Sequence, residues 1–142
     1  MTEQKNKSTL ALMELAIMIL VFAFAAALCV LMFVKAEKMS QRLLERDMAV
    51  NRCQTAAETL KAMKGDMKRT AEVLGGCVKE NDLSVYYNRN WEQDTEQQAV
   101  YILTISKNES ERYLVKGNIA LQDSDGRNVF GLPVYWQKEV VD

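Results

Sequence analysis

The sequence predicts an α+β protein in which a long N-terminal helix packs on a small antiparallel sheet of about four strands. Neither glycine nor proline occurs between Leu15 and Lys64, which favours one long helix. The second half alternates runs of β-branched and aromatic residues with turn-forming residues, which is typical of strands. An apolar stripe on the outer part of the helix also requires a partner surface, and a sheet supplies one.

The first element is an apolar segment in which Glu14 is the only charged residue between Leu10 and Val34. At about 1.5 Å per residue, the uncharged run from Leu15 to Val34 is long enough to cross a bilayer core of roughly 30 Å. The run is longer than the apolar part of a secretory signal, about 7 to 15 residues, and helix-forming residues follow it. We therefore expect a short basic leader over residues 1–9 and a retained transmembrane helix over residues 10–34, in contact with membrane lipid.

Residues 35–64 are expected to continue the same helix, because they are rich in strong helix formers. Apolar side chains recur there at spacings of three, four and seven, which indicates an amphipathic helix. These positions are Met39, Leu43, Val50, Cys53, Ala57 and Leu60, widened by Leu44, Met48 and Met63. The stripe is expected to pack on the protein's own folded domain.

Residues 65–142 are expected to form a short second helix followed by the sheet. Gly65 ends the long helix, and Asp66 is a good N-cap for the segment MKRTAEVL, which stops at Gly75 and Gly76. Turns are expected at KNESER and at DSDG, from Asp123 to Gly126. Pro133 indicates an edge strand or a bulge. The expected strands are Leu83–Tyr87, Ala99–Ser106, Tyr113–Leu121 and Val129–Trp136.

The composition argues against several classes of function. The formal charge of −1 gives no electrostatic footprint for nucleic acid. Histidine is absent, the three cysteines do not have a metal-ligand spacing, and no glycine-rich phosphate loop follows a strand. We therefore expect no catalytic residues, no metal and no cofactor. The tyrosines and tryptophans of the second half are expected to be core and cross-strand residues.

The cysteines leave one alternative open. Cys29 lies within the apolar run, whereas Cys53 and Cys77 either pack separately as thiols or form a disulfide in an oxidising compartment. Separate thiols are favoured, because the sequence shows no disulfide framework.

From Lys7 to Phe33 the sequence resembles the N-terminal segment of type IV pilins and of the pseudopilins of type II secretion. In that family a short basic leader is cleaved before an apolar helix whose fifth mature residue is glutamate. Thr9 and Leu10 would flank the cleavage point here, and Leu10 to Glu14 would place Glu14 fifth. Thr9 stands where the family has glycine, and the bend-forming proline of major pilins is missing. Both departures fit a divergent minor pilin or pseudopilin.

The resemblance implies a non-catalytic subunit of a type IV filament or a type II secretion pseudopilus. Its partners would be other pilin-like subunits, a prepilin peptidase and an assembly platform protein, with Glu14 as the assembly residue. It also implies a cytoplasmic leader and an extracytoplasmic sheet domain, although the flanking charges lean slightly the other way. The alternative is a single-pass scaffold or sensor-like interaction protein, in which Glu14 has no special role.

Overall fold

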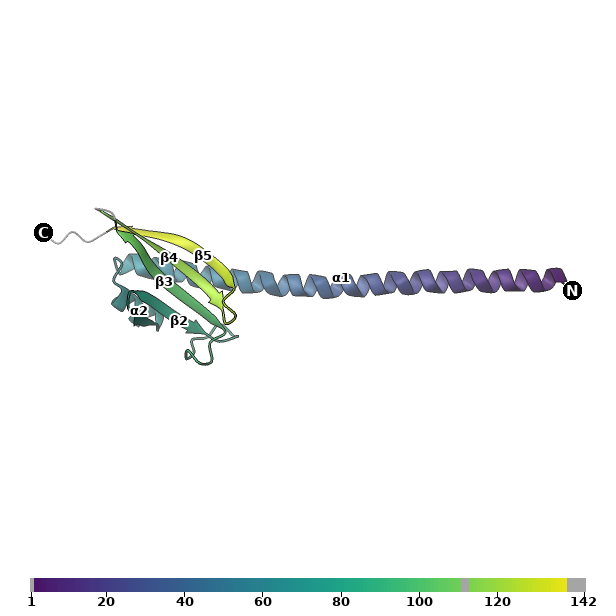
Figure 1. The fold of residues 1–142 in the computed structure, drawn as a ribbon, viewed down its shortest axis with the longest axis horizontal. Helices are drawn as coiled ribbons and strands as arrows, with labels where there is room; N and C mark the ends of the chain where they lie inside the picture. The colour runs from purple at the N-terminus through teal and green to yellow at the C-terminus, as the bar shows by residue number, and fades with distance from the viewer. Residues whose placement is uncertain (1, 111–112, 138–142) are drawn as a thin grey trace. The chain divides into compact units, whose positions relative to one another are not determined.

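The computed structural model of the chain describes residues 2–110 and 113–137. Helix α1 spans Thr2–Ala62 and helix α2 spans Met67–Leu74. They are followed by β1 (Cys77–Lys79), β2 (Asp82–Tyr87), β3 (Tyr101–Ser110), β4 (Leu114–Asp123) and β5 (Asn128–Gln137) (Figure 1). The chain divides into two compact units, Met1–Arg42 and Leu43–Asp142. The α+β class is therefore confirmed.

The described strands form one antiparallel sheet in which every strand lies beside its neighbours in sequence, in the order β1-β2-β3-β4-β5. The sheet has one strand more than expected, because β1 is only three residues long and carries no strand signal of its own. β3 starts two residues later than expected and runs to Ser110, past a bulge between Lys107 and Glu109, so much of the expected KNESER turn is strand. β5 is an edge strand, which confirms the prediction from Pro133.

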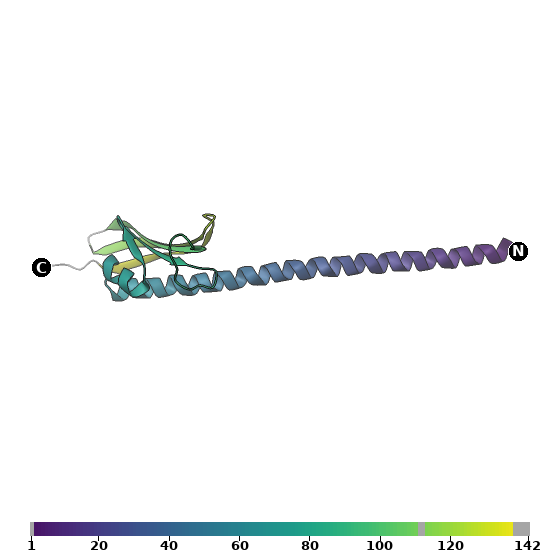
Figure 2. The ribbon, with the colours of Figure 1, turned by 90° about the horizontal axis from the view of Figure 1, so that it is seen from below.

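The sheet has an inner and an outer face, because side chains alternate along each strand. On β4, Val115, Ile119 and Leu121 are buried, and the side chains between them point away from the core. The inner face packs on residues 43–62 of α1 and on α2, which lie on the same side of the sheet (Figure 2). The largest fully buried side chains are Leu60, Leu83, Leu103, Ile105, Ile119 and Leu121.

Helix α1 contacts the sheet mainly through small residues. Ala49 and Cys53 are 0% exposed and Ala56 is 1% exposed. The buried positions advance by four, three and four residues from Ala49 to Leu60, which keeps them on one helical face. The predicted stripe is correct at Cys53, Ala57 and Leu60.

The stripe is wrong at its N-terminal end. Met39, Leu43 and Leu44 are 65%, 55% and 64% exposed. The spacing of apolar residues predicts which helical face is apolar, but it does not predict how much of the helix the sheet covers. Small alanines, which contribute little to an apolar pattern, form the contact instead.

Local capping fixes the ends of both helices. The backbone amide of Gly65 donates to the Leu60 carbonyl at 2.9 Å, and Gly65 has a φ of 81°, a left-handed conformation that favours glycine. Asp66 then accepts from the amides of Lys68 and Arg69, which begins α2 as predicted. A Cβ at Gly65 would overlap the Trp136 indole, so the last strand covers the turn that ends α1.

We predict that Ala56→Leu destabilises the sheet domain by about 1 to 3 kcal/mol, because no room exists for a larger side chain between α1 and the sheet. Trp91 and Trp136, the only tryptophans, are both buried in this domain, so urea unfolding followed by their fluorescence reports it selectively. Ala62→Leu makes the same change at an exposed position of α1 and is the control. Equal midpoints for the two variants would contradict the close contact.

Candidate functional site

The apolar part of α1 has one charged side chain, Glu14. It lies in the Met1–Arg42 unit, is exposed, and makes no hydrogen bond or ion pair with any described residue. The residues one turn away on each side, Leu10 and Met18, are apolar and also exposed. The described part of the chain therefore gives Glu14 no partner.

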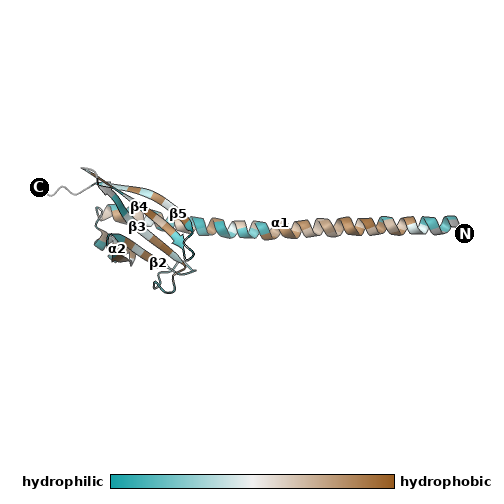
Figure 3. Cartoon of the chain, in the orientation of Figure 1, coloured by the Kyte–Doolittle hydropathy of each residue, from teal (hydrophilic) through white to brown (hydrophobic). Residues whose placement is uncertain are grey.

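The stretch of α1 that follows Glu14, from Leu15 to Val34, is uncharged and presents a hydrophobic surface (Figure 3). Phe22, Met32 and Phe33 are 77%, 73% and 78% exposed, and the most apolar stretch has none of its residues buried. An exposed apolar surface of this size marks a site that contacts either another protein or a membrane. By length and composition this is the one described helix able to cross a membrane, so it is compatible with a single-pass anchor.

The expected processing residues lie within the same helix. Thr9 and Leu10 are exposed, and α1 continues through them from Thr2, so the helix begins before the predicted mature N-terminus. The Thr9–Leu10 bond is therefore at the surface but in helical backbone.

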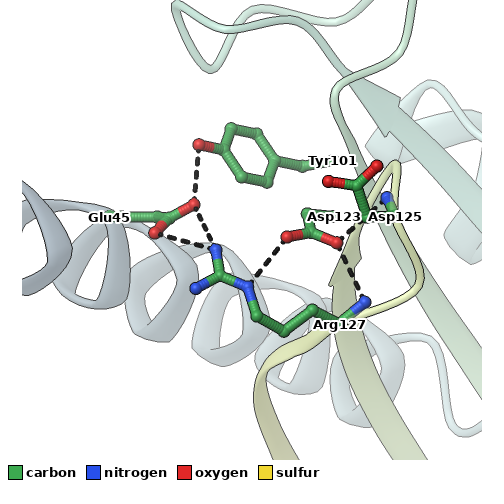
Figure 4. A network of polar contacts seen from close by, with 5 residues as sticks. All are labelled: Glu45, Tyr101, Asp123, Asp125 and Arg127. Carbon is green, nitrogen blue, oxygen red and sulfur yellow. Dashed lines mark hydrogen bonds and ion pairs between the residues drawn. The ribbon is translucent and has the colours of Figure 1, made fainter.

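In the Leu43–Asp142 unit, a group of charged and polar side chains joins α1 to the sheet. We name Glu45, Tyr101, Asp123 and Arg127 the helix–sheet clamp (Figure 4). The Tyr101 hydroxyl donates to Glu45 at 2.9 Å, and the Arg127 guanidinium lies 3.4 Å from both Glu45 carboxylate oxygens. Arg127 also donates from Nε to Asp123 at 2.9 Å. The clamp thus ties the helix to β3 and to the β4–β5 turn.

The electrostatics of the clamp follow from its contacts. Hydrogen bonds from Arg127 lower the pKa of the Asp123 carboxyl, and the same contact raises the pKa of Arg127. Desolvation, followed by the hydrogen bond to Glu45, raises the pKa of Tyr101 to about 12. The phenol therefore stays a hydrogen-bond donor at neutral pH. These contacts join the helix to the sheet.

An aromatic cluster extends the clamp along the sheet. The Trp91 ring stacks on Tyr101 with centroids 4.2 Å apart and an interplanar angle of 9°. Arg52 donates to the Trp91 carbonyl at 2.7 Å, and its guanidinium lies 5.1 Å from the centre of the Tyr87 ring. Trp91 has a φ of 63°, so these contacts hold the β2–β3 loop in a left-handed turn.

Sequence reasoning missed the charged members of these two groups. Glu45 and Arg52 are seven residues apart, so they share the helical face that packs on the sheet. That spacing is a usable signal, but the predicted stripe is defined by apolar residues alone.

The prediction of core and cross-strand aromatic residues is correct for Tyr87, Trp91 and Trp136, which are buried. It is also correct for Tyr135, which is 46% exposed but lies opposite Lys116 in the β4–β5 register. It is wrong for Tyr113, which is 62% exposed and lies outside the strands.

Cys29, Cys53 and Cys77 are free thiols. Cys53 is buried between α1 and the inner face, and this burial raises its pKa to about 11. Cys77 is opposite Ser84 in the β1–β2 register, next to the buried Leu83, which places it on the outer face. The sheet separates the two thiols, so the Cys53–Cys77 disulfide left open above is not formed.

Two further kinds of polar feature are relevant among the described residues, a metal-ligand group and a cleft. No group of three or more potential metal ligands occurs in residues 2–110 and 113–137. An open cleft of about 410 Å³ lies at the turn between α1 and α2 and is lined by Lys64, Asp66 and Arg69 among others. Its carboxylate, Asp66, already caps α2 and lies 3.6 Å from Arg69.

We predict that the stability of the sheet domain falls less steeply with alkaline pH in Tyr101→Phe than in the wild type. Because the pKa of Tyr101 rises from 10.0 unfolded to about 12 folded, its stabilising effect is complete below pH 10 and is lost as the pH rises to about 12. Urea midpoints measured across this range test the slope. Tyr135→Phe, which removes an exposed phenol, should keep the wild-type slope, and a wild-type slope in Tyr101→Phe would refute the assignment.

Comparison with known proteins identifies no family: no family model, curated protein or solved structure matches the chain. The fold is therefore known from the structure alone. It consists of a long N-terminal apolar helix whose C-terminal part packs on an antiparallel sheet.

Proposed function

We propose that this chain is a non-catalytic, membrane-anchored assembly subunit, similar to the minor pilins or pseudopilins of a type IV filament or type II secretion apparatus. The observation that carries the proposal is the exposed carboxylate of Glu14, which has no partner among the described residues. It lies in the N-terminal part of α1, whose most apolar stretch has none of its residues buried.

Energetics favour a partner for this carboxylate from outside the chain. A carboxylate at the centre of a membrane helix costs roughly 2.5 to 3.5 kcal/mol on insertion scales, and less towards the interface. A cation on a neighbouring subunit would remove that cost. The N-terminal amine of a mature chain beginning at Leu10 is a suitable cation. Pairing would then occur only at one axial offset between helices, so Glu14 would set the register of assembly.

This proposal assigns the remaining partners and the orientation. The leader would lie in the cytoplasm, where a prepilin peptidase and an assembly platform protein would meet it, and the sheet domain would lie outside the membrane. The apolar segment would contact lipid before assembly and other pilin-like subunits afterwards.

One observation favours the alternative, a single-pass scaffold or sensor-like protein. Helix α1 runs from Thr2 through Thr9 and Leu10, and Thr9 replaces the glycine of the pilin cleavage site. An uncleaved helix would keep its full N-terminal segment and would act only as an anchor for the sheet domain.

We predict that Glu14→Ala inserts into the membrane normally but is lost from filaments. Assembly should fall because the register-setting ion pair is gone, whereas removing a charge does not hinder insertion. The measurement compares the amount of the chain in sheared surface filaments and in membranes of the source cells. Glu37→Ala, which removes an exposed carboxylate of α1 beyond the apolar run, should assemble like the wild type. The proposal would be contradicted if Glu14→Ala were present in filaments in the same amount as the wild type.

We also predict that the chain isolated from its source cells lacks residues 1–9 and carries a methylated Leu10. Cleavage would create the cation that Glu14 needs, so processing and assembly are linked. Intact-mass spectrometry checks both changes at once. A chain that retains Thr9 would instead support the scaffold function.

A further inference from the structure

Three basic side chains follow the apolar run of α1 and lie together on the helix surface. We name Lys35, Lys38 and Arg42 the basic stripe. They are spaced by three and four residues, so they are neighbours on one helical face, with Cβ atoms about 5 to 6 Å apart. All three are exposed, and they lie beyond the point where α1 changes from apolar to hydrophilic (Figure 3). They belong to the Met1–Arg42 unit, so one helix segment forms the whole stripe.

The described residues supply no carboxylate to the basic stripe, because none of its side chains has an ion pair with any of them. Glu37 lies between its members in sequence, but helix side chains one or two residues apart do not face each other. Glu45 is the only acidic residue three or four positions from any member, and its carboxylate already contacts Tyr101 and Arg127. Like charges at these spacings destabilise a helix, so an anion from outside the chain would stabilise the stripe.

The basic stripe lies at the depth of the lipid headgroups when the run from Leu15 to Val34 spans the bilayer core. At about 1.5 Å per residue, Lys35 and Lys38 lie within about 6 Å of the end of that run, and the headgroup layer on each side is roughly 5 to 7 Å thick. Arg42 lies about 12 Å beyond the run. Cβ atoms in a helix tilt towards its N-terminus, which here is the direction of the membrane, so these long side chains reach back to headgroup phosphates.

We propose that the basic stripe binds the phosphate of an anionic phospholipid headgroup. Neighbouring cations at these spacings can share one phosphate through charge-assisted hydrogen bonds. Their uncompensated positive charge selects a lipid with net negative charge over a zwitterionic lipid, which carries its own cation. The tilt of the side chains towards the membrane favours lipid over an acidic partner protein. This inference rests on the proposed membrane anchorage of the chain, and it is independent of filament assembly and of Glu14.

Native mass spectrometry of the full chain in detergent tests this inference, because it measures the lipids that remain bound. The probes are phosphatidylglycerol, which is anionic, and phosphatidylcholine, which is zwitterionic, at equal concentrations. The wild type should bind phosphatidylglycerol more tightly, and neutralising the stripe should remove that preference. One cation beside an anionic lipid surface is worth about a fivefold change in affinity, so phosphatidylglycerol should bind the stripe variant at least about tenfold more weakly. The stripe variant carries Lys35→Gln, Lys38→Gln and Arg42→Gln.

A matched control variant removes the same number of lysines and arginines from exposed positions outside the stripe. It carries Lys61→Gln, Lys68→Gln and Arg89→Gln. This variant should bind phosphatidylglycerol like the wild type, and tryptophan fluorescence checks that both variants are folded. The inference is overturned if the two variants bind phosphatidylglycerol equally, or if the wild type binds both lipids equally.

Sedimentation of the same chains in detergent distinguishes lipid from a protein partner. A stripe variant that keeps phosphatidylglycerol but loses self-association would place a protein contact at the stripe and would overturn the inference. Glu14→Ala should bind phosphatidylglycerol like the wild type, because it leaves the stripe intact. Wild-type chain in the soluble fraction of the source cells would overturn both this inference and the proposed membrane anchorage, whereas failure of lipid binding alone would leave the chain in membranes.

Discussion

The close contact between the second half of α1 and the inner face of the sheet is the constraint on which the folded domain depends. Ala49, Cys53 and Ala56 are buried on the helical face that packs on the sheet, and Leu60 extends the contact into the core. Because small residues leave little apolar area per residue, other contacts must hold the ends of the interface. The helix–sheet clamp does so at Glu45, and the Trp136 indole does so over Gly65. Each end therefore joins α1 to strands distant from it in sequence.

The sequence predicts those parts of the fold that depend on residues close together in the chain, and it misses those that depend on distant residues. Helix α2 is predicted from Asp66 and Gly75, because both caps act within a few residues. Strand β1 is missed, because its turn places Glu80 at a φ of 57° without the glycine or asparagine usual for that conformation. The pair between Glu45 and Arg127 spans 82 residues, and only the tertiary fold brings the two side chains together. The candidate site at Glu14 shows the opposite situation. It was found from the sequence alone, because it interrupts an apolar run.

The polar contacts of the described residues distinguish charged groups that the fold pairs from a charged group that it leaves unpaired. Within the described residues, no buried side-chain nitrogen or oxygen lacks a hydrogen bond, so the sheet domain satisfies its own polar groups. Glu45 and Arg52, although charged and on the packed face of α1, are satisfied by Tyr101, Arg127 and Trp91. Glu14 differs because no residue in the described ranges, 2–110 and 113–137, pairs with its carboxylate. In an aqueous setting such a carboxylate needs no explanation, but in lipid it does, and the apolar helix around it favours lipid.

The contact proposed for Glu14 has a consequence for the symmetry of assembly. Pairing of Glu14 with the N-terminal amine of a neighbouring copy would join two different surfaces, so the contact would be heterologous and could repeat without closing. A contact of this kind can build a filament, whereas a contact between two identical surfaces closes after two copies. The proposed pairing is therefore open-ended along the helices, as the proposed assembly role of Glu14 requires.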